Sequence, residues 1–135
     1  MDYFNDAFGD FNPQTDPHAA VKFVINNMLM DDRLNELICL LTDGHDIGGV
    51  EGEPGWIVER RDTGPSGDMP GYADWPIGVN FRVYVDQDSF HLAHPQQFLK
   101  IDDFHNYVHK AIDAYLVKNP SKTSIGNAVI SKLAK

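Results

Sequence analysis

The stretch Val79-Asn80-Phe81-Arg82-Val83-Tyr84-Val85 alternates side chains with a period of two. This period is typical of a β-strand with one buried face, because successive side chains point to opposite sides of a sheet. The four apolar positions of one parity would face a core, and Arg82 and Tyr84 would face the other side. The stretch therefore predicts a sheet with one face that must be covered.

Two other segments supply partners for this strand. Residues 56–61, Trp-Ile-Val-Glu-Arg-Arg, are the only strand-like run in the glycine-rich segment that precedes it. After it, residues 86–88, Asp-Gln-Asp, are turn-like, and residues 89–93, Ser-Phe-His-Leu-Ala, suit the second strand of a hairpin. We therefore expect a small antiparallel sheet of about three strands.

Helical patterns flank the strands on both sides. Asp16-Pro17 is typical of a helix start, with Asp as the N-cap, and Asn119-Pro120 is typical of a helix end. Apolar residues recur at helical spacing near residues 17–30 and 32–42, from Asp102 onward, and from 121 to about 133. Two helices before the strands and two after them predict an α+β fold, with about four helices against one face of the sheet.

The length of 135 residues fits a single domain over residues 1–135. Residues 1–15 mix aromatic side chains with Asp, Asn and Gly and show no clear period, so we expect them either to be loosely ordered or to dock their aromatic side chains on the core. The first residues lack the basic and apolar regions of a secretory signal, and no apolar run approaches the roughly 20 residues that cross a bilayer. These features predict a cytoplasmic protein that does not bind a membrane.

Negative charge is concentrated in the first part of the chain. The net charge is −9, yet residues 1–59 hold twelve acids against Lys22 and Arg33, whereas residues 60–135 hold eight acids and nine bases. Such a field repels nucleic acid phosphates and attracts basic proteins. We therefore expect a basic protein partner and no direct binding of nucleic acid. An acidic surface that only keeps the protein soluble is the simpler alternative.

The segment of residues 43–78 differs from its surroundings, with nine of the eleven glycines and four of the eight prolines. Irregular segments of this length are often functional. Aromatic side chains within a charged rim are typical of protein interfaces, where aromatics anchor and charges steer. We therefore predict a partner-binding site here, with Trp56 more typical of the core. The predicted site residues are Asp43, Asp46, Glu51, Glu53, Asp62, Asp68, Tyr72, Asp74 and Trp75.

The histidines come closest to a metal or catalytic pattern. His91 and His94 are separated by two residues, and His105 and His109 lie one helical turn apart, a spacing at which two imidazoles can bind zinc. The metalloprotease motif would need Glu directly after His105, where the chain has Asn106. These four histidines are candidate metal ligands, and ordinary packing at the flank of a helix is the alternative interpretation.

Other catalytic motifs are absent from the sequence. The acids near residues 43–53 and 86–88 lack the spacing of a calcium-binding loop. No serine lies in a Gly-x-Ser-x-Gly elbow, and no glycine cluster has the pattern of a phosphate-binding loop. We therefore expect a binding protein without a cofactor rather than an enzyme.

In size, acidity and lack of a catalytic motif, the chain resembles the immunity proteins of bacterial toxin systems, including contact-dependent growth inhibition. The segment Phe90-His91-Leu92-Ala93-His94-Pro95-Gln96-Gln97-Phe98-Leu99, followed by residues 102–108, also looks like the strand-to-helix junctions of such proteins. The resemblance implies a protein that binds a cognate toxin domain, often a basic nuclease, and blocks its active site or substrate groove.

Two other hypotheses remain open. A metal-dependent enzyme would bring the four histidines together around one ion. An acidic mimic of nucleic acid, from a mobile element, would place its carboxylates in a regular stripe in the manner of backbone phosphates.

Overall fold

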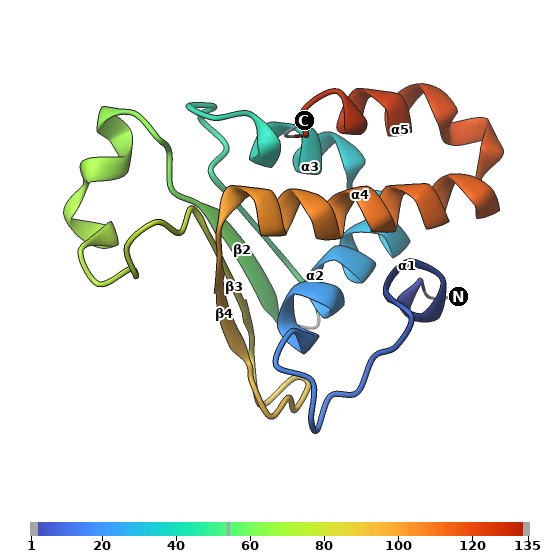
Figure 1. Ribbon diagram of the computed structural model, residues 1–135, viewed down its shortest axis with the longest axis horizontal. Helices are drawn as coiled ribbons and strands as arrows, with labels where there is room; N and C mark the ends of the chain where they lie inside the picture. Colours follow the sequence, from blue (N-terminus) through green and yellow to red (C-terminus); the bar gives the residue numbers. More distant parts are fainter. Residues whose placement is uncertain (1–2, 54, 134–135) are drawn as a thin grey trace.

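The structure is a computed structural model that describes residues 3–53 and 55–133. It confirms the α+β fold, with helices against one face of an antiparallel sheet (Figure 1). The sheet has four strands rather than about three: β1 (Gly49–Gly52), β2 (Trp56–Arg60), β3 (Phe81–Val85) and β4 (Gln96–Leu99). The α-helices are α1 (Phe4–Phe8), α2 (Ala19–Met30), α3 (Leu34–Leu41), α4 (Ile101–Lys118) and α5 (Thr123–Ile130). Short 3-10 helices are η1 (Pro65–Asp68), η2 (Pro70–Tyr72) and η3 (Pro120–Lys122).

The strands lie in the sheet in chain order, β1-β2-β3-β4, and each neighbouring pair is antiparallel. The alternation predicted for β3 is confirmed, since Phe81, Val83 and Val85 are buried. Val58 of β2 lies opposite Val83 in the register. The sheet is therefore a simple meander with one face against the helices.

The two edge strands differ from the sequence prediction. Residues 89–93 do not form the second strand of the hairpin, because Phe90 packs its ring against Phe23 of α2, with centroids 4.6 Å apart, and Leu92 is buried in the same connection. The partner of β3 is β4, which begins after Pro95. The other edge strand, β1, lies inside the glycine-rich segment and begins and ends with glycine, so no alternation marks it in the sequence.

The central element of the helical layer is α2, and ten of its twelve residues are buried. It contacts β2, β3 and β4 as well as α1, α3 and α4. Beside it, Phe104 of α4 stacks on Phe81 of β3, with ring centroids 4.2 Å apart. Within the described chain, no helix combines the length and apolarity needed to cross a membrane.

The start of the chain packs onto α2 and α4, although its sequence shows no clear period. Tyr3 is 5% exposed, its backbone N donates to Asn26 Oδ1 at 2.7 Å, and its hydroxyl accepts a hydrogen bond from Asn119 Nδ2 at 3.0 Å. Lys22 of α2, also buried, forms an ion pair with Asp16 at 2.6 Å. These contacts join the N-terminal segment to the two longest helices.

Candidate protein-binding face

The helices leave one face of the sheet uncovered (Figure 1). We call it the open face, and its side chains are exposed or half-buried. Its residues are Glu51, Ile57, Glu59, Arg82, Tyr84, Gln96 and Phe98. On this face Arg82 forms an ion pair with Glu59 and donates from Nε to Gln96 Oε1 at 2.9 Å. The open face therefore mixes charged, aromatic and aliphatic side chains.

The open face is hollowed at the turn between β1 and β2. This hollow of about 690 Å³ is lined by Glu51, Gly52, Glu53, Gly55, Trp56, Ile57, Tyr84 and Asp86. Trp56 is itself buried, as expected for a core residue. Ile57 and the ring of Tyr84 lie opposite each other in the register and form an apolar pair. Two predicted acids, Glu51 and Glu53, line the same hollow as this apolar pair. A long cationic side chain fits such a place, because its stem can pack on the apolar pair while its charged end reaches the carboxylates.

Ion pairs divide the carboxylates of the molecule into two groups. In the helical layer, acids from early in the chain pair with lysines from late in the chain, as Asp6 does with Lys118 at 2.8 Å and Asp32 with Lys122 at 3.6 Å. On the strands and their loops, eight carboxylates form no ion pair with any described residue: Asp43, Asp46, Glu51, Glu53, Asp68, Asp74, Asp86 and Asp88. Most of the unpaired negative charge therefore belongs to the sheet and its loops.

Two of the predicted acids, Asp43 and Asp62, are engaged within the chain. Asp62 accepts hydrogen bonds from Arg60 Nε at 2.6 Å and from Ser66 Oγ at 2.7 Å. Asp43 accepts hydrogen bonds from the backbone N and Oγ1 of Thr63. Burial raises the pKa of Asp62, but its hydrogen bonds outweigh burial and lower the pKa to about 2. These two carboxylates therefore hold loops of the chain together.

Arg60 of β2 is a buried cation, and the sequence predicts only that this residue belongs to a strand. It is 4% exposed, and its guanidinium donates to the carbonyl oxygens of Cys39 and Leu40 in the last turn of α3. It also donates to the carbonyls of His45 and Ile47 in the loop between α3 and β1. Arg60 thus places its positive charge at the negative end of the α3 dipole, where it pairs the Leu40 carbonyl and shares the Cys39 carbonyl with Thr42 N.

The predicted aromatic anchors pack onto the open face. The Trp75 ring meets Tyr72 and Phe98 edge to face, with centroids 5.0 Å and 5.3 Å away. The Tyr72 hydroxyl donates to the carbonyl of Arg60 at 3.2 Å, and the Arg61 guanidinium lies over the Tyr72 ring. Trp75 and Tyr72 therefore fasten the β2–β3 loop to the sheet.

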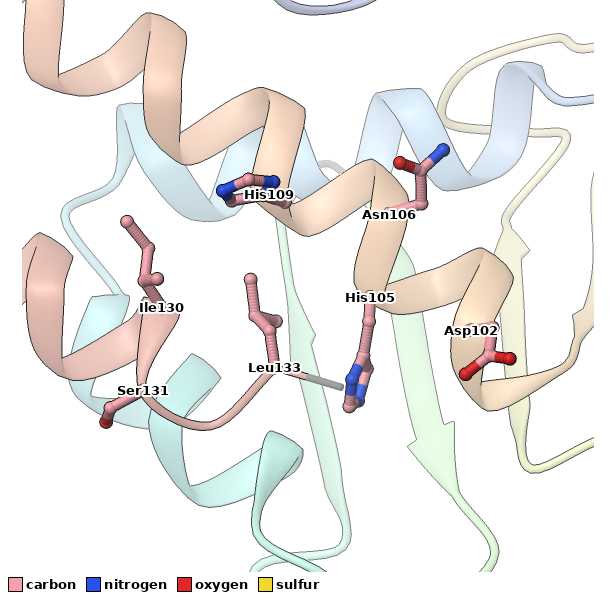
Figure 2. A pocket seen from close by; sticks show the side chains of 7 residues that line it. All are labelled: Asp102, His105, Asn106, His109, Ile130, Ser131 and Leu133. Carbon is pink, nitrogen blue, oxygen red and sulfur yellow. The ribbon is translucent and has the colours of Figure 1, made fainter. Parts of the chain in front are cut away.

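The four candidate histidines do not gather at one site. His91 and His94 are exposed in the connection between β3 and β4, whereas His105 and His109 lie on α4 and line another hollow (Figure 2). Among the described residues, no group of three or more His, Cys, Asp or Glu side chains could hold a metal ion. The metal-site hypothesis built on these four histidines is therefore contradicted for the part of the chain that the structure describes.

The hollow beside α4, of about 520 Å³, contains Asp102, His105 and Ser131, the residue types of a hydrolase triad. Figure 2 shows the Ser131 side chain turned away from His105, and its Oγ donates to the carbonyl of Ala128 at 2.7 Å. Burial lowers the pKa of His105, and the charge of Asp102 offsets this effect only in part. A triad needs a hydrogen bond between the nucleophile and the histidine, and Ser131 uses its hydroxyl elsewhere.

The predicted site omits Ile57, Tyr84 and Asp86, which line the hollow with Glu51 and Glu53. The outward parity of Ile57 and Tyr84 in their strands is visible in the sequence and could have indicated them. No family model, no curated protein and no solved structure matches this chain.

Proposed function

We propose that the protein binds a basic protein through its open face and thereby inhibits that partner. The observation that carries this proposal is the hollow in which Glu51, Glu53 and Asp86 stand beside Ile57 and Tyr84 without an ion pair to any described residue. A Lys or Arg of a partner supplies the missing charge, and the apolar pair supplies contact area.

The partner that fits this surface is a bacterial toxin domain such as a nuclease, and the protein would then be its immunity protein in the cytoplasm. A nuclease presents basic side chains to the phosphates of its substrate. A face rich in unpaired carboxylates is complementary to such a groove and would compete with the substrate for it. Inhibition of this kind requires no catalytic residue and no cofactor.

The distribution of charge favours a protein partner over mimicry of nucleic acid. Unpaired carboxylates lie at the β1–β2 turn and in the β2–β3 loop, which are opposite ends of the strands. Between them the open face carries the Glu59–Arg82 ion pair and the half-buried Tyr84. A mimic would need carboxylates at regular, phosphate-like intervals, whereas this mixture of aromatic and charged side chains is typical of protein interfaces.

Neutralising the hollow tests the proposal. Glu51→Gln with Glu53→Gln removes two charges from the hollow, and Asp31→Asn with Asp113→Asn removes two exposed charges from the helical layer as a matched control. Each protein is coupled to a matrix, proteins of the source organism are retained at low salt, and their association rates are measured at low and high salt. We expect to retain a basic protein whose association rate falls as the salt concentration rises. The hollow variant should bind it roughly tenfold more slowly than the wild type does, and the control variant should bind it at the wild-type rate.

Inhibition is measured as the loss of the retained protein's own activity when the wild-type chain is added. If the retained protein is a nuclease, that activity is DNA cleavage. A retained protein that is not basic would contradict the proposal. So would an association rate that is insensitive to salt, or equal effects of the two charge variants.

A further inference from the structure

The β2–β3 loop, residues 61–80, projects beyond the sheet on the side that the helices leave uncovered (Figure 1). We infer that this loop inserts into a recess of the partner, burying Ile77 and Met69 there, an inference that rests on the proposed function. The open face would then supply charge complementarity, and the loop would supply an apolar anchor.

The loop is held in shape by its own hydrogen bonds. Arg61 Nε donates to the carbonyl of Gly67 at 2.7 Å, and Asn80 Nδ2 donates to the carbonyl of Arg61 at 3.0 Å. The contacts of Thr63 with Asp43 and of Trp75 with Phe98 fasten the same loop to the segment that follows α3 and to the open face. A loop ordered before binding does not lose conformational entropy when a partner arrives, so its contact area converts more fully into affinity.

Within this ordered loop, two large apolar side chains are left in water. Ile77 is 100% exposed and Met69 is 59% exposed, whereas Tyr72 and Trp75 are half-buried. Single exposed apolar residues are common on protein surfaces, so exposure alone does not make these two an anchor; the ordered loop that carries them and the charges beside them indicate one. Burial of one such side chain in a complex strengthens binding by roughly tenfold or more.

Charges beside these side chains indicate the chemistry of the recess. Asp68 precedes Met69, and Asp74 lies three residues before Ile77; both acids are exposed and form no ion pair with any described residue. The complementary recess is apolar inside and cationic at its rim. An anionic membrane surface would repel both aspartates.

The test removes the apolar anchor without touching the sheet. Ile77→Ser with Met69→Ser is compared with Val117→Ser on α4, whose side chain is 82% exposed. Because all three side chains are exposed, both variants should keep the thermal unfolding midpoint of the wild type. The probe is a displayed library of random short peptides selected on the wild-type protein. We expect enriched peptides that combine apolar residues with Lys or Arg, whose affinity falls roughly tenfold or more for the loop variant and stays within about twofold for Val117→Ser.

Peptides that bind the loop variant as tightly as the wild type would overturn the inference, and so would a selection that enriches no peptide. Retention of the wild type, but not of the loop variant, on vesicles of neutral lipid would assign the loop to a membrane instead.

The two proposals fail separately. If a captured basic protein binds the hollow variant more weakly and the loop variant as tightly as the wild type, the result supports the proposed function alone. Loop-dependent peptides without any captured basic protein support the loop alone.

Discussion

Arg60 joins the end of α3, the α3–β1 loop and Asp62 through one guanidinium. Its partners are carbonyl oxygens and one carboxylate; the hydrogen bond to the Leu40 carbonyl is buried and the others are partly buried. If the guanidinium is removed, the buried Leu40 carbonyl loses its donor without gaining water, whereas Cys39 and Asp62 keep the donors Thr42 N and Ser66 Oγ. A buried polar group left in this state costs about 1–3 kcal/mol. Arg60 should therefore contribute more to stability than an arginine at the surface.

Replacing Arg60 by Met should lower the free energy of unfolding by about 3–5 kcal/mol. Arg60→Lys should recover little of this loss, because an ammonium cannot reproduce the planar fork of donors. Arg82→Met is the matched control: its ion pair with Glu59 is partly solvated, so its loss should cost less than about 1 kcal/mol. Urea unfolding compares the variants, and equal losses at the two positions would contradict the role given to Arg60.

The low pKa of Asp62 predicts a loss of stability in acid. Its pKa is about 2 in the folded protein against an ordinary value of 3.8. Between these values the unfolded chain takes up a proton and the folded protein does not, so the contribution is present above about pH 4 and is lost as the pH falls toward 2. It amounts to at most about 2 kcal/mol. Asp62→Asn should therefore cost most near neutral pH and progressively less in acid.

Urea unfolding of the wild type and Asp62→Asn at about pH 7 and about pH 3 measures this difference. Asp46→Asn is the control, since Asp46 is exposed and forms no ion pair with a described residue. A cost of Asp62→Asn that does not change with pH would show that the carboxylate acts through shape alone.

Arg60 also shows how far a strand pattern can predict a site. Trp56, Val58 and Arg60 share one face of β2, and all three are buried, so the period of two puts Arg60 on the same face as two core residues. Its acceptors lie on α3 and in a loop, and their positions are set only by tertiary packing. Prediction of the hollow from the sequence is limited in the same way. The outward orientation of Tyr84 follows from its position in β3, whereas the proximity of Glu51 depends on how β1 pairs in the sheet.

At the scale of elements, the β2–β3 loop depends on Gly67. This glycine is buried, and a Cβ built there would collide with the backbone carbonyl of Asp62, which cannot move aside as a side chain can. Gly67→Ala should therefore disrupt the loop, with altered amide chemical shifts over residues 61–80 and weaker binding of loop-selected peptides. Gly71→Ala is the control in the same loop, since its Cβ would meet nothing within 4 Å. Identical spectra for the two variants would show that the loop has no fixed conformation.

The sheet shows why strand order is harder to predict than strand existence. The period of β3 was sufficient to predict a strand there. Its partner was misplaced because Phe90 and Leu92 have strand-like spacing but pack as a loop, where Ala93 N donates to the carbonyl of Pro13 at 2.8 Å. The true partner, β4, begins with two glutamines, a composition that does not stand out from a loop.

At the scale of the whole molecule, Tyr3 ties the start of the chain to the end of α4. Its ring packs beside Tyr115, with centroids 5.7 Å apart, and its hydroxyl accepts a hydrogen bond from Asn119. Tyr3→Ala should lower the free energy of unfolding by about 3–5 kcal/mol, as expected for the loss of a buried aromatic side chain. Tyr3→Phe removes only the hydroxyl and should cost about 1 kcal/mol. Thermal or urea unfolding measures both, and a small effect of Tyr3→Ala would mean that the N-terminal segment packs weakly.

The charge pattern of the chain and that of the folded molecule are not the same. By sequence, the acidic side is the first 59 residues. In the structure, part of that charge is matched by lysines from the C-terminal helices, as in the Asp6–Lys118 and Asp32–Lys122 pairs. Much of the charge left unpaired among the described residues lies near β1, joined by Asp68, Asp74 and Asp86 from the later, near-neutral part of the chain. A count of charges along the sequence predicts the sign of the partner's charge. Only the fold indicates which surface would bind that partner.

The burial of α2 has a consequence for how the protein is made. Ten of its twelve residues are buried, and much of the surface that covers them, from β2 to α4, is synthesised after it. A helix that is apolar on nearly every side has no stable place in water until its neighbours exist. A nascent chain that ends before residue 101 therefore presents α2 to the ribosome surface and to chaperones, and such chains are prone to aggregate. Folding is completed only when α4 has emerged from the exit tunnel.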